Sequence, residues 1–525
     1  MINDKVLNFE EIDSDFSIHP QLLPILQEKG VDTDVLMDIT LNPVFEKLID
    51  PDSLPNMGNL VKAILRSAGR REKILVWGHE DADGITSVAV MLETLKNMDA
   101  PGGYYIPSKI SEGHGLTTDG IDLAARNGYG VILTVDNGSG DLDMVEYARS
   151  IGMDILVTDH HELTKPTAGI TVVNPKMGGA FKHLAGVSVA LKVIWAIMRL
   201  RNSYTLADIE REFPELVVFA MLGTLADKVP MFAENKAIVD RGRELMSRLS
   251  LPFIRAYERI RGQRPTPESI ITAISAGKST GSYHPGVELL MTPDQARAED
   301  LLRELSEEAD RWFARAEKVY LEYAQSVRRV RGYILLEAGD TEPGYLSYIS
   351  SKLKKRYDVP AIVMGRKPDG NYVAEIRAPH GYDMMDMLSN VSNLLLDYGG
   401  HKLAAGFTME AEHLAAFAEE IEYYFTQGKG VFDSTRGAEV VFSTSLPDAL
   451  ELLDSAERLG KLGVEIRFLI DGPAREVSGL FARYNTYDPE GLLSIHGGDI
   501  GIKVLASSGT DGYTVENLWL VSGNA

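Results

Sequence analysis

Short apolar runs alternate with helix-like stretches between residues 71 and 175. Three of these runs are rich in Val, Ile and Leu, and each leads into a polar loop; they lie at 73–77, 131–135 and 154–158. We expect shorter strands at 103–106 and 170–173, and helices at 85–98, 116–127 and 142–150. Strands that alternate with helices build parallel sheets, so this pattern predicts a doubly wound α/β domain.

The rest of the chain shows two further patterns. Residues 184–325 have the apolar spacing of helices, expected at 187–200, 216–225 and 297–328. Strands return at 331–336, 361–364 and 372–376, with a helix at 345–356, and short β segments from 432 onward suggest a small barrel. The expected domains are a helical extension (1–70), a first α/β domain (71–300), a connector helix (301–328), a smaller second α/β domain (329–430) and a C-terminal β-rich domain (431–525).

Composition excludes cysteine-based chemistry and bears on the cellular location of the protein. The 525 residues include no cysteine, which excludes disulfides, thiolate zinc sites and cysteine nucleophiles. Residues 1–20 lack the apolar stretch of a secretory signal, and the longest apolar runs fall short of the ~20 residues of a membrane helix. We therefore expect a cytoplasmic protein without a membrane span.

The net charge of −23 opposes general binding to nucleic acid, since affinity for phosphates comes largely from Lys and Arg. It does not exclude a local site, because metal ions held by carboxylates reverse the local sign of the charge. Basic clusters at 66–73, 328–331 and 352–356 are more often solvated faces than binding sites.

The loop after the first strand carries three candidate metal ligands. His79, Asp81 and Asp83 occupy alternate positions, which share one face of an extended backbone. Gly84 then permits the chain to turn into the next helix. An acidic turn that caps this helix explains the same residues equally well, so the loop alone decides nothing.

Other candidate ligands follow later elements. Asp136 follows the run at 131–135, and Asp159, His160 and His161 follow the run at 154–158. Asp227 ends an apolar helical stretch, where an aspartate is ordinarily just a helix-end residue. Carboxylate and imidazole are good ligands for Mn²⁺ and related ions. Because ligands of α/β sheets collect at the carboxyl ends of the strands, these loops together predict a two-metal hydrolase site.

Five motifs in this order resemble the DHH phosphoesterase superfamily and, within it, the RecJ-type single-strand-specific exonucleases. They are GHEDADGITS (78–87), VDNG (135–138), VTDHHE (157–162), GTLADKVP (223–230) and GGHKLAAG (399–406). The resemblance covers roughly residues 70–425. It implies a catalytic DHH domain, a smaller DHH-associated domain and single-stranded nucleic acid bound in a cleft between them. The region from about 432 lies where bacterial RecJ proteins carry an oligonucleotide-binding barrel.

The resemblance also implies roles for individual residues. Asp159 resembles the first residue of the DHH motif, which supports or joins the metal cluster, and His161 resembles the histidine near the scissile phosphate. Two Mn²⁺ or Mg²⁺ ions would be held by His79, Asp81, Asp83, Asp136, His160 and Asp227. Phosphates of the substrate would contact Lys109, Arg377 and His401. The segment around Arg377 lacks the serines that usually flank it, so strict recognition of a 5′-phosphate is not implied.

The implied function is a metal-dependent exonuclease on single-stranded DNA in repair, recombination or replication, with 5′→3′ polarity expected from the resemblance alone. RNA is an alternative substrate. Two other functions share these motifs: a phosphodiesterase for short oligonucleotides or cyclic dinucleotides, and a replication scaffold. Such phosphodiesterases are usually shorter than this chain, and such scaffolds typically lose ligands that are all present here. An active nuclease that also docks on replication or repair proteins is left open.

Overall fold

The computed structural model describes residues 18–108, 112, 115–163, 169–325, 327, 332–379, 381–426, 438–445, 449–488, 493 and 501–520. The chain divides into two compact units, and each is considered by itself. The first contains Met1–Ala309, Leu450–Glu465 and Ser508–Gly512, and the second contains Asp310–Ala449, Ile466–Ser507 and Tyr513–Ala525.

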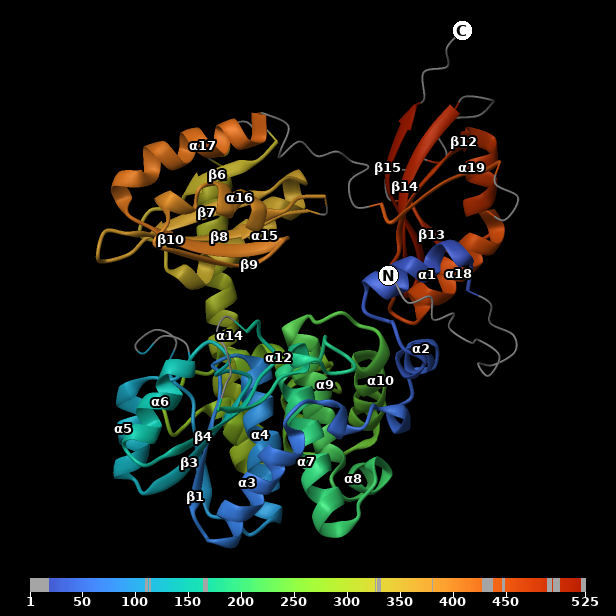
Figure 1. Ribbon diagram of the computed structural model, residues 1–525. Coiled ribbons are helices and arrows are strands. Elements are labelled where there is room, and N and C mark those ends of the chain that lie inside the picture. Colours follow the sequence, from blue (N-terminus) through green and yellow to red (C-terminus); the bar gives the residue numbers. More distant parts are fainter. Residues whose placement is uncertain are drawn as a thin grey trace. The chain divides into compact units, whose positions relative to one another are not determined.

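The first unit is built on a five-stranded sheet (Figure 1). Its order is β2 (Gly102–Tyr105), β1 (Lys73–Trp77), β3 (Tyr129–Val135), β4 (Asp154–Thr158) and β5 (Thr171–Val173). All neighbouring strands pair in parallel, which confirms the predicted doubly wound sheet. The chain reverses its direction of strand addition between β1 and β3, and folds of this kind bind ligands at that point.

Helices cover both faces of this sheet (Figure 1). On one face the core contains Trp77, Ile132 and Val145; the helices there are α5 (Thr118–Arg126) and α6 (Leu142–Ser150). On the other face lie α3 (Met57–Gly69), α4 (Ala82–Asn97) and α7 (Gly186–Asn202). Helices α4 and α7 are buried along most of their length, because further helices pack on their outer sides.

An all-helical region completes the first unit. Its central helix, α9 (Pro214–Asp227), is apolar on every side and is buried from Leu216 to Thr224. The helices around it and its neighbours are α8 (Leu206–Glu212), α10 (Ala233–Arg248), α11 (Pro252–Arg261), α12 (Pro267–Ala276) and α13 (Pro285–Met291). Two short helices, α1 (Leu23–Glu28) and α2 (Asp34–Leu41), precede α3. The predicted connector is α14 (Gln295–Ala324), and the boundary between the units falls within it.

The second unit contains the smaller α/β sheet that was expected. Its order is β6 (Ile334–Glu337), β7 (Ala361–Arg366), β8 (Tyr372–Arg377), β10 (Ala404–Met409) and β9 (Asp397–His401). Strands β6 and β7 pair in parallel, and the other neighbours are antiparallel. One face packs on α15 (Pro343–Tyr357) and the other on α16 (Met384–Asn390) and α17 (Leu414–Thr426). The glycine-rich strand β9 was not expected, since it lacks the β-branched residues typical of strands.

The described strands of the C-terminal region form an open sheet, which differs from the barrel considered above, and the same stretch of sequence contains two helices. Its strand order is β11 (Val440–Ser443), β12 (Arg467–Pro473), β14 (Gly501–Gly509), β15 (Gly512–Leu520) and β13 (Thr486–Tyr487). Within the described part of this region, β11 and β13 are edges and do not pair. The helices are α18 (Ala449–Lys461) and α19 (Ala474–Phe481). Leu452, Ala456 and Leu459 are buried at helical spacing, a period that the expectation of short β segments overlooked.

A bilayer-spanning helix is not found in the described ranges, because none of their helices is long and apolar enough.

A buried ion pair attaches the N-terminal extension to the helices of the first unit. Lys192 Nζ on α7 lies 2.6 Å from Glu234 Oε1 on α10, and the two side chains are 2% and 1% exposed. Lys192 also donates to the Ile49 carbonyl (2.5 Å), and the Ile49 N–H donates to Glu234 (2.8 Å). Each charged group therefore has a partner inside the protein, as burial of charge requires.

Lys192→Met should lower the free energy of unfolding by about 3–5 kcal/mol, because it leaves the Glu234 carboxylate buried without its cation. Adding Glu234→Leu should recover much of this loss, since no buried charge then remains. Urea unfolding followed by circular dichroism measures both effects. Lys47→Ala is the control, because its ion pair with Asp38 is exposed and contributes about 1 kcal/mol or less. A Lys192→Met protein as stable as the wild type would contradict this account.

Candidate metal centre

The loop after β1 turns directly into α4. Asp81 caps this helix, since its side chain accepts a hydrogen bond from the Gly84 N–H (2.9 Å). His79 Nδ1 lies 2.8 Å from Asp81 Oδ2. A Cβ on Gly84 would lie 2.4 Å from the His79 carbonyl oxygen, so this turn requires glycine. The expectation of an extended run through Asp83 is wrong, because the helix begins at Ala82 and places Asp83 in its first turn.

Asp83 is 1% exposed and is held by the start of another helix. Its Oδ2 and Oδ1 accept hydrogen bonds from the N–H groups of Gly186 (2.7 Å) and Val187 (2.9 Å), the first residues of α7. A helix N-terminus suits a carboxylate, because its first N–H groups have no partner within the helix. Burial, and then the neighbouring Asp227 carboxylate, nevertheless raise the pKa of Asp83 to about 7.

Asp136 follows β3 with a left-handed backbone (φ 60°), a conformation that few residues other than glycine adopt. Its side chain is buried against the start of α7, where a Cβ on Gly186 would lie 2.6 Å from Asp136 Oδ1. Burial, and then the carboxylates of Asp83 and Asp81, raise the pKa of Asp136 well above its ordinary value. The metal-free cluster thus opposes the charged form of this carboxyl.

In the segment after β4, the Asp159 carboxylate orients the ring of His161. Asp159 Oδ1 accepts from the His160 N–H (2.7 Å) and lies 2.8 Å from His161 Nδ1, while Oδ2 accepts from the Ser139 N–H (2.9 Å). Burial by itself would raise the pKa of Asp159, but the bond with His161 and the charges of both histidines lower it overall. The same bond, partly opposed by burial, raises the pKa of His161 to about 9.

His160 occupies the middle of the cluster. Its Nε2 lies 3.1 Å from Asp136 Oδ1 and 4.0 Å from Asp83 Oδ2, and its Nδ1 lies 3.6 Å from Asp227 Oδ2. Asp227 is the last residue of α9, which ends with Lys228 in a left-handed conformation. The His160 imidazole thus lies next to carboxylates from three separate segments, namely α4, the loop after β3 and α9.

Three groups of side chains have ligand atoms within 4.8 Å of one another. They are Asp136–His160–His161, His79–Asp81–Asp136 and Asp83–His160–Asp227. Asp136 Oδ1 and His160 Nε2 are buried and lie 3.1 Å apart, yet neither forms a hydrogen bond with any described residue. Such oxygen and imidazole nitrogen atoms are the donors that Mn²⁺ and related ions bind, so the residues present fit a divalent metal.

The structure brings together every residue predicted to hold or support the metal, while their roles as ligands stay predictions. Both carboxylate oxygens of Asp159 are engaged with neighbouring groups of the protein, which is the arrangement of a residue that supports the cluster. Lys109 lies outside the described residues. Arg377 and His401 belong to the second unit; the Arg377 guanidinium donates to Glu375 (2.9 Å), and the His401 backbone lies in β9.

The residues that hold the ligands were missed from the sequence. The N–H groups of Gly186, Val187 and Ser139 bind the carboxylates of Asp83 and Asp159. Backbone N–H groups are the same in every residue except proline, so they leave no pattern in the side chains. The one available signal was the start of an apolar helix at Gly186, since a helix start is a site for anions.

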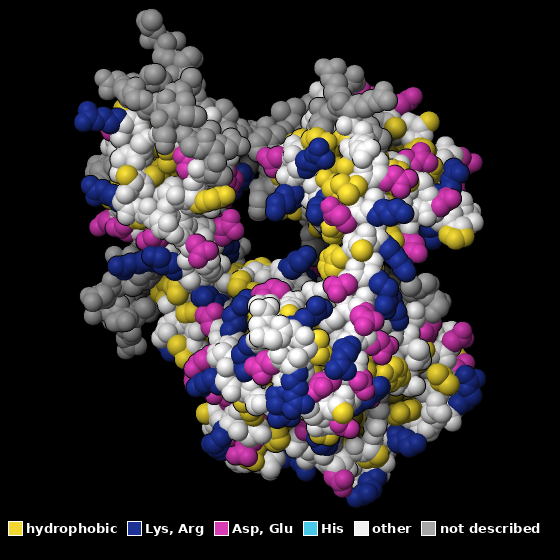
Figure 2. Space-filling model, turned by 180° about the vertical axis from the view of Figure 1, so that it is seen from behind, with side chains coloured by type: hydrophobic (Ala, Val, Ile, Leu, Met, Phe, Trp, Pro, Cys, Tyr) yellow, Lys and Arg dark blue, Asp and Glu magenta, His cyan; other side chains and the backbone are white. Residues whose placement is uncertain are grey.

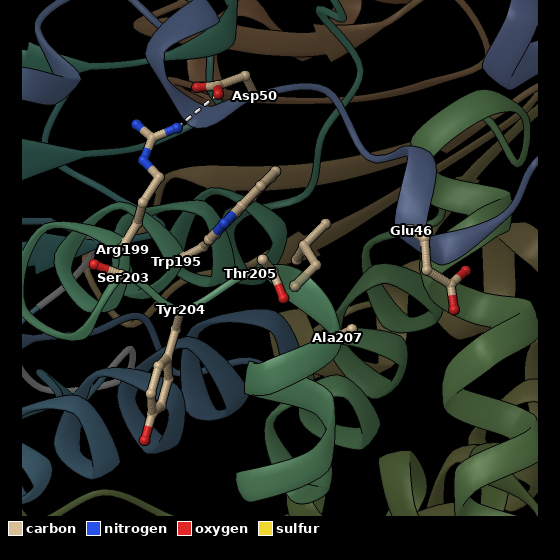
Figure 3. A pocket seen from close by; sticks show the side chains of 9 residues that line it. Glu46, Asp50, Trp195, Arg199, Ser203, Tyr204, Thr205 and Ala207 are labelled. Atoms are coloured by element: carbon tan, nitrogen blue, oxygen red, sulfur yellow. Dashed lines mark hydrogen bonds and ion pairs between the residues drawn. The ribbon is translucent and has the colours of Figure 1, made fainter.

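A separate pocket of about 430 Å³ lies at the other end of α7. Figure 3 shows Trp195, Tyr204 and Arg199 at this pocket, with Arg199 paired to Asp50 (2.6 Å). Because α7 has 17 residues, its two ends are about 25 Å apart. This pocket is therefore distinct from the metal cluster, which lies at the start of the helix.

Two family models match this chain, one described as the N-terminal domain of the DHH family (residues 73–223) and one as the DHHA1 domain (residues 331–427). The single-stranded-DNA-specific exonuclease RecJ of Bacillus subtilis is 29% identical to it over 425 residues, which are 78% of this chain and 52% of that protein. The protein of the same name from Haemophilus influenzae is 27% identical over 434 residues, 77% of this chain and 74% of that one. The chain is a RecJ-like member of the DHH superfamily.

This RecJ-like chain spans about half the length of the Bacillus subtilis relative. The crystal structure of RecJ in complex with Mn²⁺ from Thermus thermophilus aligns with 96% of this chain and 76% of that one, with a TM-score of 0.63 and 19% identity. At this identity the likeness shows a shared fold. The loops after β1, β3 and β4 lie within the first matched range, and Asp227 lies just beyond it.

Binding of Mn²⁺ to this RecJ-like protein should weaken as the pH falls below about 7. The Asp83 carboxyl has a pKa of about 7 without metal, so a cation must displace its proton at lower pH. Each displaced proton should cost about tenfold in affinity per pH unit below that pKa. Calorimetric titrations near pH 6 and pH 8, in buffers of different ionisation enthalpy, measure the dissociation constant and the protons released. Equal dissociation constants at the two pH values would refute the expectation.

Proposed function

We propose that this chain is a metal-dependent exonuclease that hydrolyses phosphodiester bonds of single-stranded DNA. The observation that carries the proposal is the convergence of His79, Asp136, His160 and Asp227, from four segments, on one buried cluster. Relatives that carry the name single-stranded-DNA-specific exonuclease support the substrate class. A RecJ crystal structure that contains Mn²⁺ supports the choice of metal.

Two Mn²⁺ or Mg²⁺ ions in this cluster would lower the pKa of a bound water and offset the negative charge of the phosphate. Their proposed ligands are His79, Asp81, Asp83, Asp136, His160 and Asp227. Asp159 is proposed to support them, or to join them, through its hydrogen bonds.

His161 is the proposed catalytic residue beside the scissile phosphate. Its side chain is 54% exposed, and in the metal-free protein its raised pKa favours the positively charged ring at neutral pH. Asp159 fixes the ring through Nδ1 and leaves Nε2 to donate a hydrogen bond or a proton to a phosphate oxygen.

Phosphates away from the metals are proposed to contact Lys109, Arg377 and His401. On the face shown in Figure 2, Lys and Arg side chains are interspersed with Asp and Glu. Together with the net charge of −23, this favours binding by a few local cations over binding by a broad basic surface.

Four finer points rest on the family resemblance alone and are proposed with it. They are the 5′→3′ polarity, the role in repair, recombination or replication, the docking on proteins of those processes, and the cytoplasmic location. No described contact bears on them.

Asp136→Asn should lower the rate of hydrolysis about a thousandfold, which corresponds to ~4 kcal/mol of lost charge stabilisation. EDTA should stop the wild-type reaction and Mn²⁺ should restore it. The assay follows single-stranded DNA, RNA and a dinucleotide, each labelled at either end, so that it also reports polarity. Asp50→Asn is the matched control, because Asp50 is an exposed aspartate at the far end of α7.

The other outcomes of this assay would favour one of the alternative functions or contradict the assignment of the site. Cleavage of the dinucleotide alone would favour the phosphodiesterase for short substrates. A folded protein that hydrolyses nothing with Mn²⁺ would favour the scaffold, and full activity of Asp136→Asn would contradict the assignment of the site.

Arg377→Gln should weaken binding to single-stranded DNA in a salt-dependent way. Loss of one phosphate contact should reduce the slope of log K against log salt concentration by about 0.7. Fluorescence anisotropy with a labelled oligonucleotide and without metal measures this slope, and Lys355→Gln, at an exposed position of α15, is the control. An unchanged slope would mean that Arg377 does not bind phosphate.

A further inference from the structure

Three buried asparagine side chains, Asn137, Asn174 and Asn235, connect segments that carry the proposed metal ligands. They are 7%, 0% and 0% exposed. In each, the single Nδ2 group donates two hydrogen bonds to two different acceptors. We refer to these three residues as the asparagine clamps.

Asn137 joins the ends of two strands. Its Nδ2 donates to the carbonyl oxygens of Trp77 (3.2 Å) and Val135 (2.8 Å), the last residues of β1 and β3. His79 lies two residues beyond the first acceptor, and Asp136 directly follows the second. The clamp therefore fixes the spacing between the two strand ends from which these ligands extend.

Asn174 acts on the segment after β4. Its Nδ2 donates to the His161 carbonyl oxygen (2.9 Å) and to Ser139 Oγ (3.0 Å). Ser139 in turn donates its N–H to Asp159. The clamp thus ties the loop after β3 to the loop after β4.

Asn235, near the start of α10, acts on two segments that are remote in sequence. Its Nδ2 donates to the carbonyl oxygens of His183 (2.6 Å) and Pro230 (2.9 Å). His183 lies three residues before Gly186, whose N–H holds Asp83, and Pro230 lies three residues after Asp227. Asp83 and Asp227 belong to the same group of ligand atoms, so this clamp sets the distance between their supports.

Only asparagine suits these positions. Two acceptors converge on one planar nitrogen that carries two hydrogens and no charge, whereas serine has one donor and aspartate has none. The Oδ1 atoms of Asn137 and Asn235 are buried without a hydrogen-bond partner among the described residues. In both side chains the amide donors are therefore used while the amide oxygen is left unsatisfied, which costs free energy.

We propose that the asparagine clamps are positioning residues that hold the ligand-bearing segments at metal-binding spacing before a cation arrives. The proposal rests on the proposed metal centre. Without such connections, neighbouring carboxylates would push their segments apart, and a cation would have to draw them together again. Residues that support metal ligands from behind ordinarily change metal affinity by about ten- to a hundredfold.

The test measures Mn²⁺ affinity by calorimetry on full-length Asn235→Leu and Asn235→Ser proteins. Leucine has a similar size and no donor, and serine keeps a polar group that is too short to reach both acceptors. We expect dissociation constants about ten- to a hundredfold higher than in the wild type. Near-ultraviolet circular dichroism in EDTA identifies the folded variants, and Asn174→Ala provides a second clamp for the same measurement.

Asn97→Ala is the matched control. Asn97 is exposed, and its Nδ2 also donates two hydrogen bonds, both to Glu93 within α4. Asn97 lies at the opposite end of α4 from Asp83 and joins no two segments, so its loss should leave Mn²⁺ affinity unchanged.

A double-mutant cycle separates positioning from general damage to the fold. If Asn235 acts through Asp227, Asn235→Leu should change Mn²⁺ affinity much less in an Asp227→Asn background than in the wild type. Equal effects in both backgrounds, or unchanged affinity in the folded variants, would overturn the proposal. A wild-type protein that binds Mn²⁺ but leaves DNA intact would refute the proposed nuclease and leave this comparison of affinities valid.

Discussion

Repulsion among buried carboxylates is the constraint on which the first unit depends. The buried Asp83 and Asp136 and the partly exposed Asp227 surround the single imidazole of His160. Burial and mutual repulsion raise the pKa of Asp83 and Asp136, so the metal-free protein resists the charged state that a cation needs. The cluster persists because the surrounding backbone is fixed by other interactions.

The fold provides these interactions through rigid elements that meet at one edge of the sheet. Adjacent strands β1, β3 and β4 end side by side, which brings the loops with His79, Asp136 and His160 together. The start of α7 lies at the same edge and offers its first N–H groups to Asp83. Helix α9, buried on all sides, delivers Asp227 from a distant part of the chain. Helices and strands, rather than long loops, therefore position the side chains of this cluster.

The second unit and the C-terminal region follow different designs. The sheet of β6 to β10 is mostly antiparallel and is covered on both faces, with Arg377 at the end of β8. The described C-terminal strands form an open sheet in place of a closed barrel, and α19 packs against β12. The described C-terminal strands therefore lack the closure that defines a small barrel.

The sequence by itself determined the strands of the parallel sheet, the helices that alternate with them and the acidic and imidazole side chains at the sheet edge, but it did not predict α8 and α10 to α13 individually. These are local properties. The spacing of apolar residues indicates a helix or a strand, and the type of a side chain determines whether it can bind a metal ion. Tertiary structure alone decided how those side chains are held. The contacts between Asp83 and Gly186, and between Asn235 and His183, join residues far apart in the chain. In each of these contacts at least one partner is a backbone N–H or carbonyl group, which nearly every residue has, so the pattern of residue types does not reveal the contact before the chain is folded.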